Sequence, residues 1–290
     1  MWGDKADFFT FAESIGLSIS QAEKIHTCRS VGLANHKDKQ AMLTFAENIN
    51  FIRQAIENPA TQTIVSSEIQ LDPCSKLIIH VSNPRFVFWS LVEYMGRKKQ
   101  WTNPSIVDET VILKSGAIVS PTGCVLGEGV VIEEGAIVLP GVRIGKNCII
   151  GSGSVIGSDG LEVKDTIYGR VRITHDAGVV IDENVTIGAA CTINKGLLGH
   201  DTFIGKDTKI DSGVHIAHSC RIGSKNIITA NVTFGGAVST EEEVFIGLNA
   251  TIVNGVTLGS RSFIGAGSVV VRTIDSDQKI LPYPSKAFPI

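Results

Sequence analysis

The chain has 290 residues, enough for two domains or for one extended repeat with a cap, and its 30 glycines suit a fold with many tight corners. A formal net charge of −3 argues against a nucleic-acid-binding protein, which normally presents a basic face. No run of 18 apolar residues is present and the first residues do not form a signal peptide, so we expect no transmembrane segment and a cytoplasmic protein.

The cysteines are scattered through the chain without any Cys-x-x-Cys pair. In a chain of this length, that distribution indicates free thiols in a reducing compartment rather than a disulfide framework. The six positions are Cys28, Cys74, Cys124, Cys148, Cys191 and Cys220.

The first part of the chain, residues 1–103, shows no long repeat and is predicted to form a small α/β domain. Short β-rich apolar runs alternate there with amphipathic stretches, and Pro84 stands where the first turn of a helix tolerates it. The expected helices cover residues 7–16, 48–58 and 86–95, and the expected strands cover 41–46, 62–65 and 76–81.

Residues 104–274 repeat a bulky apolar residue at every sixth position. A helix would space such residues by three and four, and a half-buried strand by two. A six-residue period is typical of hexapeptide repeats, in which three units close one triangular coil. The fold class predicted is therefore mainly β: a left-handed parallel β-helix preceded by the small α/β domain. The best-kept positions are 204, 210, 216, 222, 228, 234, 246, 252, 258, 264 and 270, with Thr240 breaking the series.

The start, the interruptions and the end of the repeat lead to further expectations. The repeat is predicted to begin with Ile106, Ile112 and Ile118 pointing inward, followed by a shift of two residues before Leu126. Segments 157–178 and 194–202 break the period, so each is expected to leave the coil as a loop or hairpin. Residues 275–290 are predicted to form an irregular, Pro-rich strap that caps the last coil.

The best catalytic candidate is His218, in the segment His215-Ile216-Ala217-His218. Ile216 points inward, so His218 lies near a corner, and a coil of 18 residues places Gly236 beside it. A neutral imidazole can accept a proton from an attacking amine, and a backbone N–H of glycine can stabilise a tetrahedral oxyanion. This pairing is what acyl transfer requires.

Two other interpretations of the histidines remain open. They can be ordinary surface residues of a β-helix corner. Some hexapeptide proteins instead hold zinc with three histidines across a subunit interface, although the spacing here is not diagnostic and no metal site is predicted. The potential ligands would be His175, His200, His215 and His218.

The whole pattern resembles the UDP-3-O-acylglucosamine N-acyltransferase family of lipid A biosynthesis. The resemblance covers nearly the whole chain and rests on motifs in both domains. These motifs are Asn83-Pro84-Arg85 before a Phe-rich helix, Gly157-Ser158-Asp159-Gly160, Thr192-Ile193-Asn194-Lys195-Gly196, and Ile210-Asp211 leading to Ile216-Ala217-His218-Ser219.

The resemblance implies an N-acyl transfer from a thioester to the amino group of a UDP-linked amino sugar. It gives His218 the role of base and Gly236 that of oxyanion donor, with His215 and Asp211 as further candidates for contact with the substrate. Phe45, Asn48 and Phe51 reproduce the spacing with which the family stacks and hydrogen-bonds a uracil. The family also implies a homotrimer, an acyl carrier protein as donor and no cofactor beyond the donor's phosphopantetheine.

The chain departs from the family at several points. Phe51 replaces a tyrosine, Ile49 stands where proline is usual, and no second histidine is found near Asn254-Gly255. No C-terminal helices follow the repeat. Two alternatives therefore stay open: an acyl-coenzyme A-dependent enzyme that acts on another nucleotide-linked amino sugar, such as a dTDP sugar, for a surface glycan, and a non-catalytic scaffold.

Overall fold

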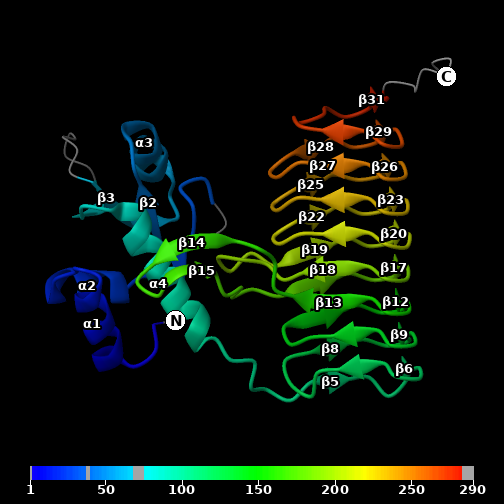
Figure 1. Cartoon of the computed structure of the whole chain (residues 1–290), viewed down its shortest axis with the longest axis horizontal. Coiled ribbons are helices and arrows are strands. Elements are labelled where there is room, and N and C mark those ends of the chain that lie inside the picture. Colours follow the sequence, from blue (N-terminus) through cyan, green and yellow to red (C-terminus); the bar gives the residue numbers. More distant parts are fainter. Residues whose placement is uncertain (1, 37–39, 68–74, 283–290) are drawn as a thin grey trace, which may run out of the picture. The chain divides into compact units, whose positions relative to one another are not determined.

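The computed structural model describes residues 2–36, 40–67 and 75–282, and their contacts divide the chain into two compact units (Figure 1). The first unit contains residues 1–100 together with 161–176, and the second contains residues 101–160 and 177–290. The segment 161–176 interrupts the repeat in the sequence but packs with the first unit. Cys74 and residues 283–290 of the expected capping strap lie outside the described residues.

The first unit is built on a parallel sheet of order β1-β2-β3-β4 within the described residues. The predicted strands and helices are confirmed, whereas α2 and β1 were not anticipated. The strands are β1 Ser30–Val31, β2 Met42–Ala46, β3 Thr61–Ser66 and β4 Leu77–His80. The helices are α1 Lys5–Ser14, α2 Ile19–His26, α3 Ile49–Glu57 and α4 Pro84–Lys98.

Helix α4 is the central core element of this unit. Asn83 caps it by accepting a hydrogen bond from the backbone N–H of Phe86 at 3.0 Å, and Pro84 occupies its first turn. Every residue from Val87 to Gly96 is buried, so the helix is covered on all sides. A helix that is apolar around most of its circumference forms a core rather than a surface layer.

The first interruption of the repeat forms a hairpin that covers α4. Strands β14 Val163–Thr166 and β15 Gly169–Arg172 pair antiparallel, as the expectation of a loop or hairpin allowed. The backbone N–H of Ile167 donates to Ser90 Oγ at 3.0 Å, and that of Thr174 donates to Glu93 Oε2 at 2.8 Å. These bonds supply partners for the buried Ser90 and Glu93 of α4.

The second unit is a left-handed parallel β-helix, as the sequence predicted. Within the described residues its short strands stack into three parallel sheets, each named here after its first strand. The β5 sheet contains β5 Ile106–Val107, β8 Val125–Leu126, β11 Val142–Ile144, β16 Val179–Ile181, β19 Thr202–Ile204, β22 Arg221–Ile222, β25 Ser239–Thr240 and β28 Thr257–Leu258. The β6 sheet contains β6 Ile112–Leu113, β9 Val131–Ile132, β12 Ile149–Ile150, β17 Thr186–Ile187, β20 Lys209–Ile210, β23 Ile227–Ile228, β26 Phe245–Ile246, β29 Phe263–Ile264 and β31 Lys279–Ile280. The β7 sheet contains β7 Ile118–Val119, β10 Ile137–Val138, β13 Val155–Ser158, β18 Thr192–Asn194, β21 His215–Ile216, β24 Thr233–Phe234, β27 Thr251–Ile252 and β30 Val269–Val270.

The inward position of each repeat forms the core of the β-helix. The last inward aliphatic residue of each strand is buried through the middle coils, for example Ile216, Ile222 and Ile228 at 1% exposure or less. Thr240 keeps the inward position where the apolar series breaks. Its Oγ1 accepts hydrogen bonds from Asn226 Nδ2 and from the backbone N–H of Gly223, so the buried hydroxyl is satisfied.

Several corners place asparagine in the left-handed conformation, which costs other non-glycine residues more. These corner residues have φ angles between 54° and 58° and are Asn147, Asn184, Asn231 and Asn249. Other corners hold different residue types in the same conformation, for example Ala190, Lys225 and Arg261 at φ angles of 55–57°.

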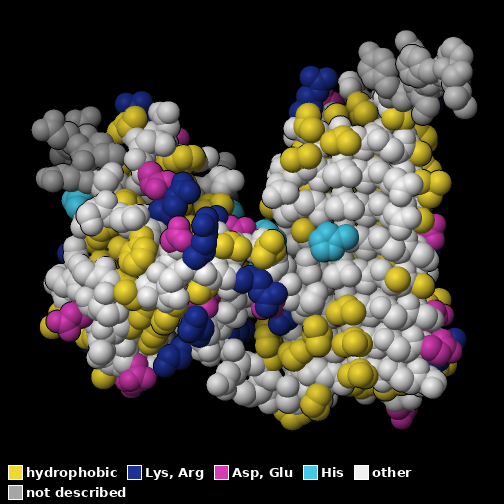
Figure 2. All heavy atoms as spheres, in the orientation of Figure 1, with side chains coloured by type: hydrophobic (Ala, Val, Ile, Leu, Met, Phe, Trp, Pro, Cys, Tyr) yellow, Lys and Arg dark blue, Asp and Glu magenta, His cyan; other side chains and the backbone are white. Residues whose placement is uncertain are grey.

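The first coil corrects one prediction. Val107 pairs with Leu126, Leu113 with Ile132 and Val119 with Val138, so these residues, and not Ile106, Ile112 and Ile118, take the inward position. The shift between Val119 and Leu126 is accordingly one residue rather than two. The three outward isoleucines are 67%, 56% and 56% exposed, and hydrophobic side chains gather at this end of the β-helix (Figure 2).

The end of the chain corrects a second prediction. Residues 279–280 were expected to be irregular, but β31 pairs in register with Phe263–Ile264 of β29 and extends the β6 sheet. Ile280 packs partly buried against the core. Alternation between an outward lysine and an inward isoleucine is enough for one more strand, even though prolines follow.

Candidate functional site

The structure brings His218 and Gly236 together. His218 follows β21 at the corner between the β7 and β5 sheets, and Gly236 follows β24 at the same corner of the next coil. A Cβ atom added to Gly236 would lie 2.6 Å from His218 Nε2 and 2.7 Å from Cε1. The imidazole therefore rests directly on the α-carbon of Gly236, and any larger residue there would displace the ring from this position.

Polar residues occupy the equivalent corner position in the neighbouring coils. The pairing of Thr192 with His215 makes Lys195 the equivalent of His218 one coil before, and the pairing of Thr233 with Thr251 makes Asn254 the equivalent of Gly236 one coil after. Asn254 stands in the region where the resembled family often has a second histidine. A column of lysine, histidine, glycine and asparagine thus runs along this corner.

An ion pair fixes Lys195 in this column. Its Nζ lies 3.5 Å from Asp159 Oδ1, and the two side chains are only 14% and 25% exposed. Shielding from solvent makes such a pair more rigid and less screened by salt than a surface pair. No pattern in the sequence indicated that Asp159 would meet Lys195.

The second interruption of the repeat packs against the same corner. Between β18 and β19 the chain leaves the coil at residues 195–201, as expected, and the backbone N–H of Leu197 donates to Ser219 Oγ at 3.0 Å. Leu197 and Leu198 are buried, so the loop is packed rather than extended. Gly196 is required in this loop because a Cβ there would overlap the carbonyl oxygen of His200.

The other substrate candidates of the β-helix lie just before His218 in the chain. His215 is half-buried on β21 and faces outward from the β7 sheet, and burial lowers the pKa of its imidazole below 6.5. Asp211 is exposed at the corner that precedes β21, so it lies at the opposite edge of this sheet from His218. Its Oδ1 accepts a hydrogen bond from the backbone N–H of Ser212 at 2.7 Å.

The nucleotide candidates lie in the first unit at the carboxyl end of β2. Phe45 is half-buried, and its ring centre lies 4.7 Å from that of Phe88 on α4. Asn48 caps α3, since its Oδ1 accepts hydrogen bonds from the backbone N–H groups of Asn50 and Phe51 at 3.1 Å each. Phe51, in the first turn of α3, is 51% exposed. Asn48 therefore caps α3 and uses only the oxygen of its amide for this.

The described residues form neither a metal-binding site nor a reactive thiol site. No group of three or more His, Cys, Asp or Glu side chains is arranged there to hold a metal ion. Burial raises the pKa of the Cys148 thiol to about 11 and that of Cys220 to about 12, which leaves both protonated and unreactive at neutral pH. Among the described residues, no helix is both long and apolar enough to cross a bilayer.

Comparisons with known proteins agree with the repeat. The family model described as "Bacterial transferase hexapeptide (six repeats)" matches residues 123–158 and 201–236, and the "Hexapeptide repeat of succinyl-transferase" matches residues 237–272. A solved structure of UDP-N-acetylglucosamine acyltransferase from Campylobacter jejuni aligns with this chain at 28% identity and a TM-score of 0.47. The alignment covers 62% of this chain and 68% of the solved chain.

Curated relatives match shorter segments. An acyl-[acyl-carrier-protein]–UDP-N-acetylglucosamine O-acyltransferase from Aliivibrio salmonicida is 37% identical over 73 residues, 25% of this chain and 28% of the relative. A UDP-3-O-acylglucosamine N-acyltransferase from a Caulobacter species is 29% identical over 93 residues, 32% of this chain and 27% of the relative. The chain thus spans less than a third of the length of these relatives. Within the matched segments the chain is similar to hexapeptide-repeat transferases and to acyltransferases named for UDP-linked glucosamines.

Proposed function

We propose that the protein is an N-acyltransferase that moves an acyl group from the thioester of an acyl carrier protein to the amino group of a UDP-linked amino sugar, as in lipid A synthesis. The observation that carries this proposal is the contact between the His218 imidazole and the α-carbon of Gly236. A scaffold has no need for a histidine that lies against a glycine of the next coil.

The proposed chemistry needs only these two residues and the substrates. The amine nitrogen attacks the thioester carbonyl carbon, and the carbonyl oxygen becomes an oxyanion near the Gly236 N–H. His218 accepts the proton that the amine nitrogen releases. The carbon–sulfur bond then breaks, and the protonated imidazole returns the proton to the leaving thiolate. The products are an amide and a free thiol, and His218 is neutral again.

Transfer to a hydroxyl is the second candidate, because the O-acyltransferase relative is more similar over its segment than the N-acyltransferase. The same base and oxyanion donor would serve either acceptor. The N-terminal motifs, Asn83-Pro84-Arg85 and the spacing of Phe45, Asn48 and Phe51, are the features that favour the amine acceptor. They resemble the N-acyltransferase family outside the hexapeptide repeat that both classes share.

The identity of the donor depends on the charge of the β-helix surface. Several basic residues that could attract an acidic carrier protein are already paired: Lys206 with Glu183 at 3.2 Å, Lys225 with Glu243 at 3.6 Å and Arg261 with Asp277 at 2.7 Å. Their field is therefore weak, and a carrier protein would bind transiently. An acyl-coenzyme A carries the same phosphopantetheine arm and is the alternative donor.

The experiment that tests this function is a matrix of UDP- and dTDP-linked amino sugars against matched acyl chains on acyl carrier protein and on coenzyme A. The proposal expects the highest kcat/KM for a UDP-amino sugar with the carrier-protein thioester. A higher kcat/KM with coenzyme A and a dTDP sugar would support the surface-glycan alternative. Absence of transfer in every combination would refute the N-acyltransferase and leave transfer to a hydroxyl or a scaffold.

We also propose the homotrimer that the family implies, since three parallel copies form a closed assembly that does not polymerise. Sedimentation equilibrium tests this independently of activity. A mass near that of one chain, 30.9 kDa, would refute it.

A further inference from the structure

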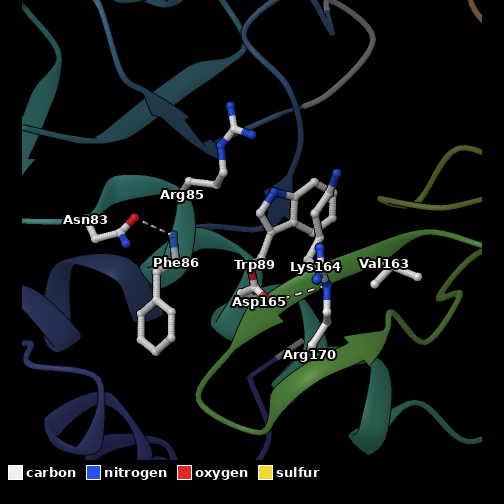
Figure 3. Close-up of a pocket in the computed structure, with 8 residues that line it drawn as sticks. All are labelled: Asn83, Arg85, Phe86, Trp89, Val163, Lys164, Asp165 and Arg170. Atoms are coloured by element: carbon white, nitrogen blue, oxygen red, sulfur yellow. Dashed lines mark hydrogen bonds and ion pairs between the residues drawn. The ribbon is translucent and has the colours of Figure 1, made fainter.

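A cavity of about 280 Å³ opens in the first unit, between the start of α4 and the hairpin β14–β15. Figure 3 shows the indole of Trp89 beside the side chains of Lys164, Asp165 and Arg170, with Asn83 and Arg85 at the start of the helix. None of these residues belongs to the candidate site of the β-helix. The cavity is lined by Asn83, Arg85, Phe86, Trp89, Val163, Lys164, Asp165 and Arg170.

The lining carries more positive than negative charge. Arg85, Lys164 and Arg170 contribute cations, and Asp165 is the single carboxylate among the described lining residues. The acids that hold two of these cations are not part of the lining. Arg85 Nε donates to both oxygens of Glu47 at 3.1 and 3.0 Å, and Lys164 pairs with Glu162. These acids position the cations without lining the cavity, and they offset part of the positive field that the cavity presents.

The pair formed by Arg170 and Asp165 in the cavity can exchange partners at low cost. Arg170 Nε lies 3.7 Å from Asp165 Oδ1, too far for a hydrogen bond, and the two side chains are 78% and 76% exposed. An exposed pair of this kind contributes little to stability. Lys164 Nζ lies 5.0 Å from the centre of the Trp89 ring, which keeps the ammonium group on the wall. The amino terminus of the 15-residue helix α4 adds partial positive charge.

The size of the cavity limits its ligand. Sites that enclose a whole small molecule usually measure about 300–1,000 Å³, so this cavity suits a fragment such as a diphosphate. Arg85 of its lining is linked to the predicted base site, because Glu47, which accepts hydrogen bonds from Arg85, directly precedes Asn48 in the chain. Two adjoining sites, one for a base and one for phosphates, match the two ends of a nucleoside diphosphate.

We propose that this cavity binds the diphosphate of the nucleotide-linked sugar, with Arg170 and Lys164 as the main contacts and Arg85 at the rim. The identity of the ligand rests on the proposed function, whereas the binding of a diphosphate can be measured without turnover. The hairpin that interrupts the β-helix repeat then has a function of its own: it completes a phosphate site on α4.

Isothermal titration of the full-length protein at low salt tests the proposal, with UDP, UMP, uridine and inorganic pyrophosphate as probes. Arg170→Ala should weaken UDP binding about three- to tenfold, because it removes a charge-assisted contact at an exposed site. Asp165→Asn should tighten UDP binding about two- to threefold, because it removes the negative charge that competes for Arg170. Both variants should bind uridine as the wild type does, and pyrophosphate should displace UDP.

Lys98→Ala is the matched control. It removes one positive charge from the other end of α4, where Lys98 pairs with Asp7 at 3.4 Å, and should leave UDP binding unchanged. The proposal is overturned if the wild type binds neither UDP nor pyrophosphate, if Arg170→Ala binds UDP normally, or if the variants change uridine binding as much as UDP binding. Phosphate-dependent UDP binding without any acyl transfer would refute the proposed function and leave this inference intact.

Discussion

The contact between His218 and Gly236 allows a substitution that disturbs the proposed base without touching it chemically. In Gly236→Ala the new methyl group would lie 2.6 Å from His218 Nε2, whereas non-bonded atoms are comfortable at about 3.5 Å. The backbone at Gly236 has no positive φ, so alanine introduces no backbone strain there. The imidazole must therefore move by about 1 Å or rotate away.

The expected effect on catalysis follows from that displacement. Misplacing a catalytic group by about 1 Å can lower the rate by about 10²-fold. His218→Ala should lower kcat by about 10²–10⁴-fold, the usual contribution of a general base. Since the imidazole is only half-buried and can swing aside, the free energy of unfolding of Gly236→Ala should fall by about 1 kcal/mol, the low end for overpacking.

A double-mutant cycle makes the prediction specific. If Gly236→Ala acts through the imidazole, the double variant with His218→Ala should be no slower than His218→Ala alone. Gly127→Ala is the control, because Gly127 also has no positive φ and its added Cβ would meet backbone atoms at 3.2–3.4 Å, away from any histidine. Steady-state kcat of the four variants and the wild type decides the matter. Wild-type kcat in Gly236→Ala, or losses that multiply in the double variant, would refute the reasoning.

Three further outcomes are expected. Asn48→Asp keeps the oxygen that caps α3 but loses the amide donor, so nucleotide affinity should fall at unchanged thermal stability. Asn48→Ala should also lose about 1 kcal/mol of stability. Equal melting temperatures for the two variants would contradict the capping role. Burial raises the pKa of Cys220 to about 12, so this thiol should resist thiol reagents at pH 8 in the folded protein and react in urea, as residue-resolved mass spectrometry would show. Because the folded state keeps the thiol proton, the contribution of Cys220 to stability should fall as the pH rises above 9.0. The pKa of His215 is lowered by burial, so the unfolded chain takes up a proton first and stability is lost as pH falls through 6.5; His215→Gln should flatten that part of a urea-unfolding series, and an unchanged slope would contradict it.

The sequence predicted the β-helix because a six-residue period leaves little choice of fold. It misplaced the first coil because Ile106-Val107, Ile112-Leu113 and Ile118-Val119 each offer two apolar residues, and periodicity alone does not say which one points inward. The pairing with Leu126 and its neighbours settles the choice. The strand at residues 279–280 was missed because the prolines that follow it indicated an irregular segment, although one more repeat is present.

The parts of the candidate site that depend on the regular coil length could be predicted from the sequence, whereas the parts that depend on tertiary packing could not. Coil length places Gly236 beside His218 from the sequence alone. The pairing of Lys195 with Asp159 joins residues 36 positions apart across an interruption, and the cavity joins α4 to a hairpin about 80 residues later. No local pattern carries such contacts, because they depend on how each interruption folds back.

The most direct test of the central claim is the chemical nature of the bond that the protein forms. Wild type and His218→Ala are incubated with an acyl carrier protein thioester and a UDP-linked amino sugar, and the product is analysed by mass spectrometry before and after hydroxylamine. The account predicts an acylated nucleotide sugar that hydroxylamine leaves intact, as an amide should be, and its near absence with His218→Ala. An adduct that hydroxylamine removes would identify an ester, and equal product from His218→Ala would exclude the proposed base.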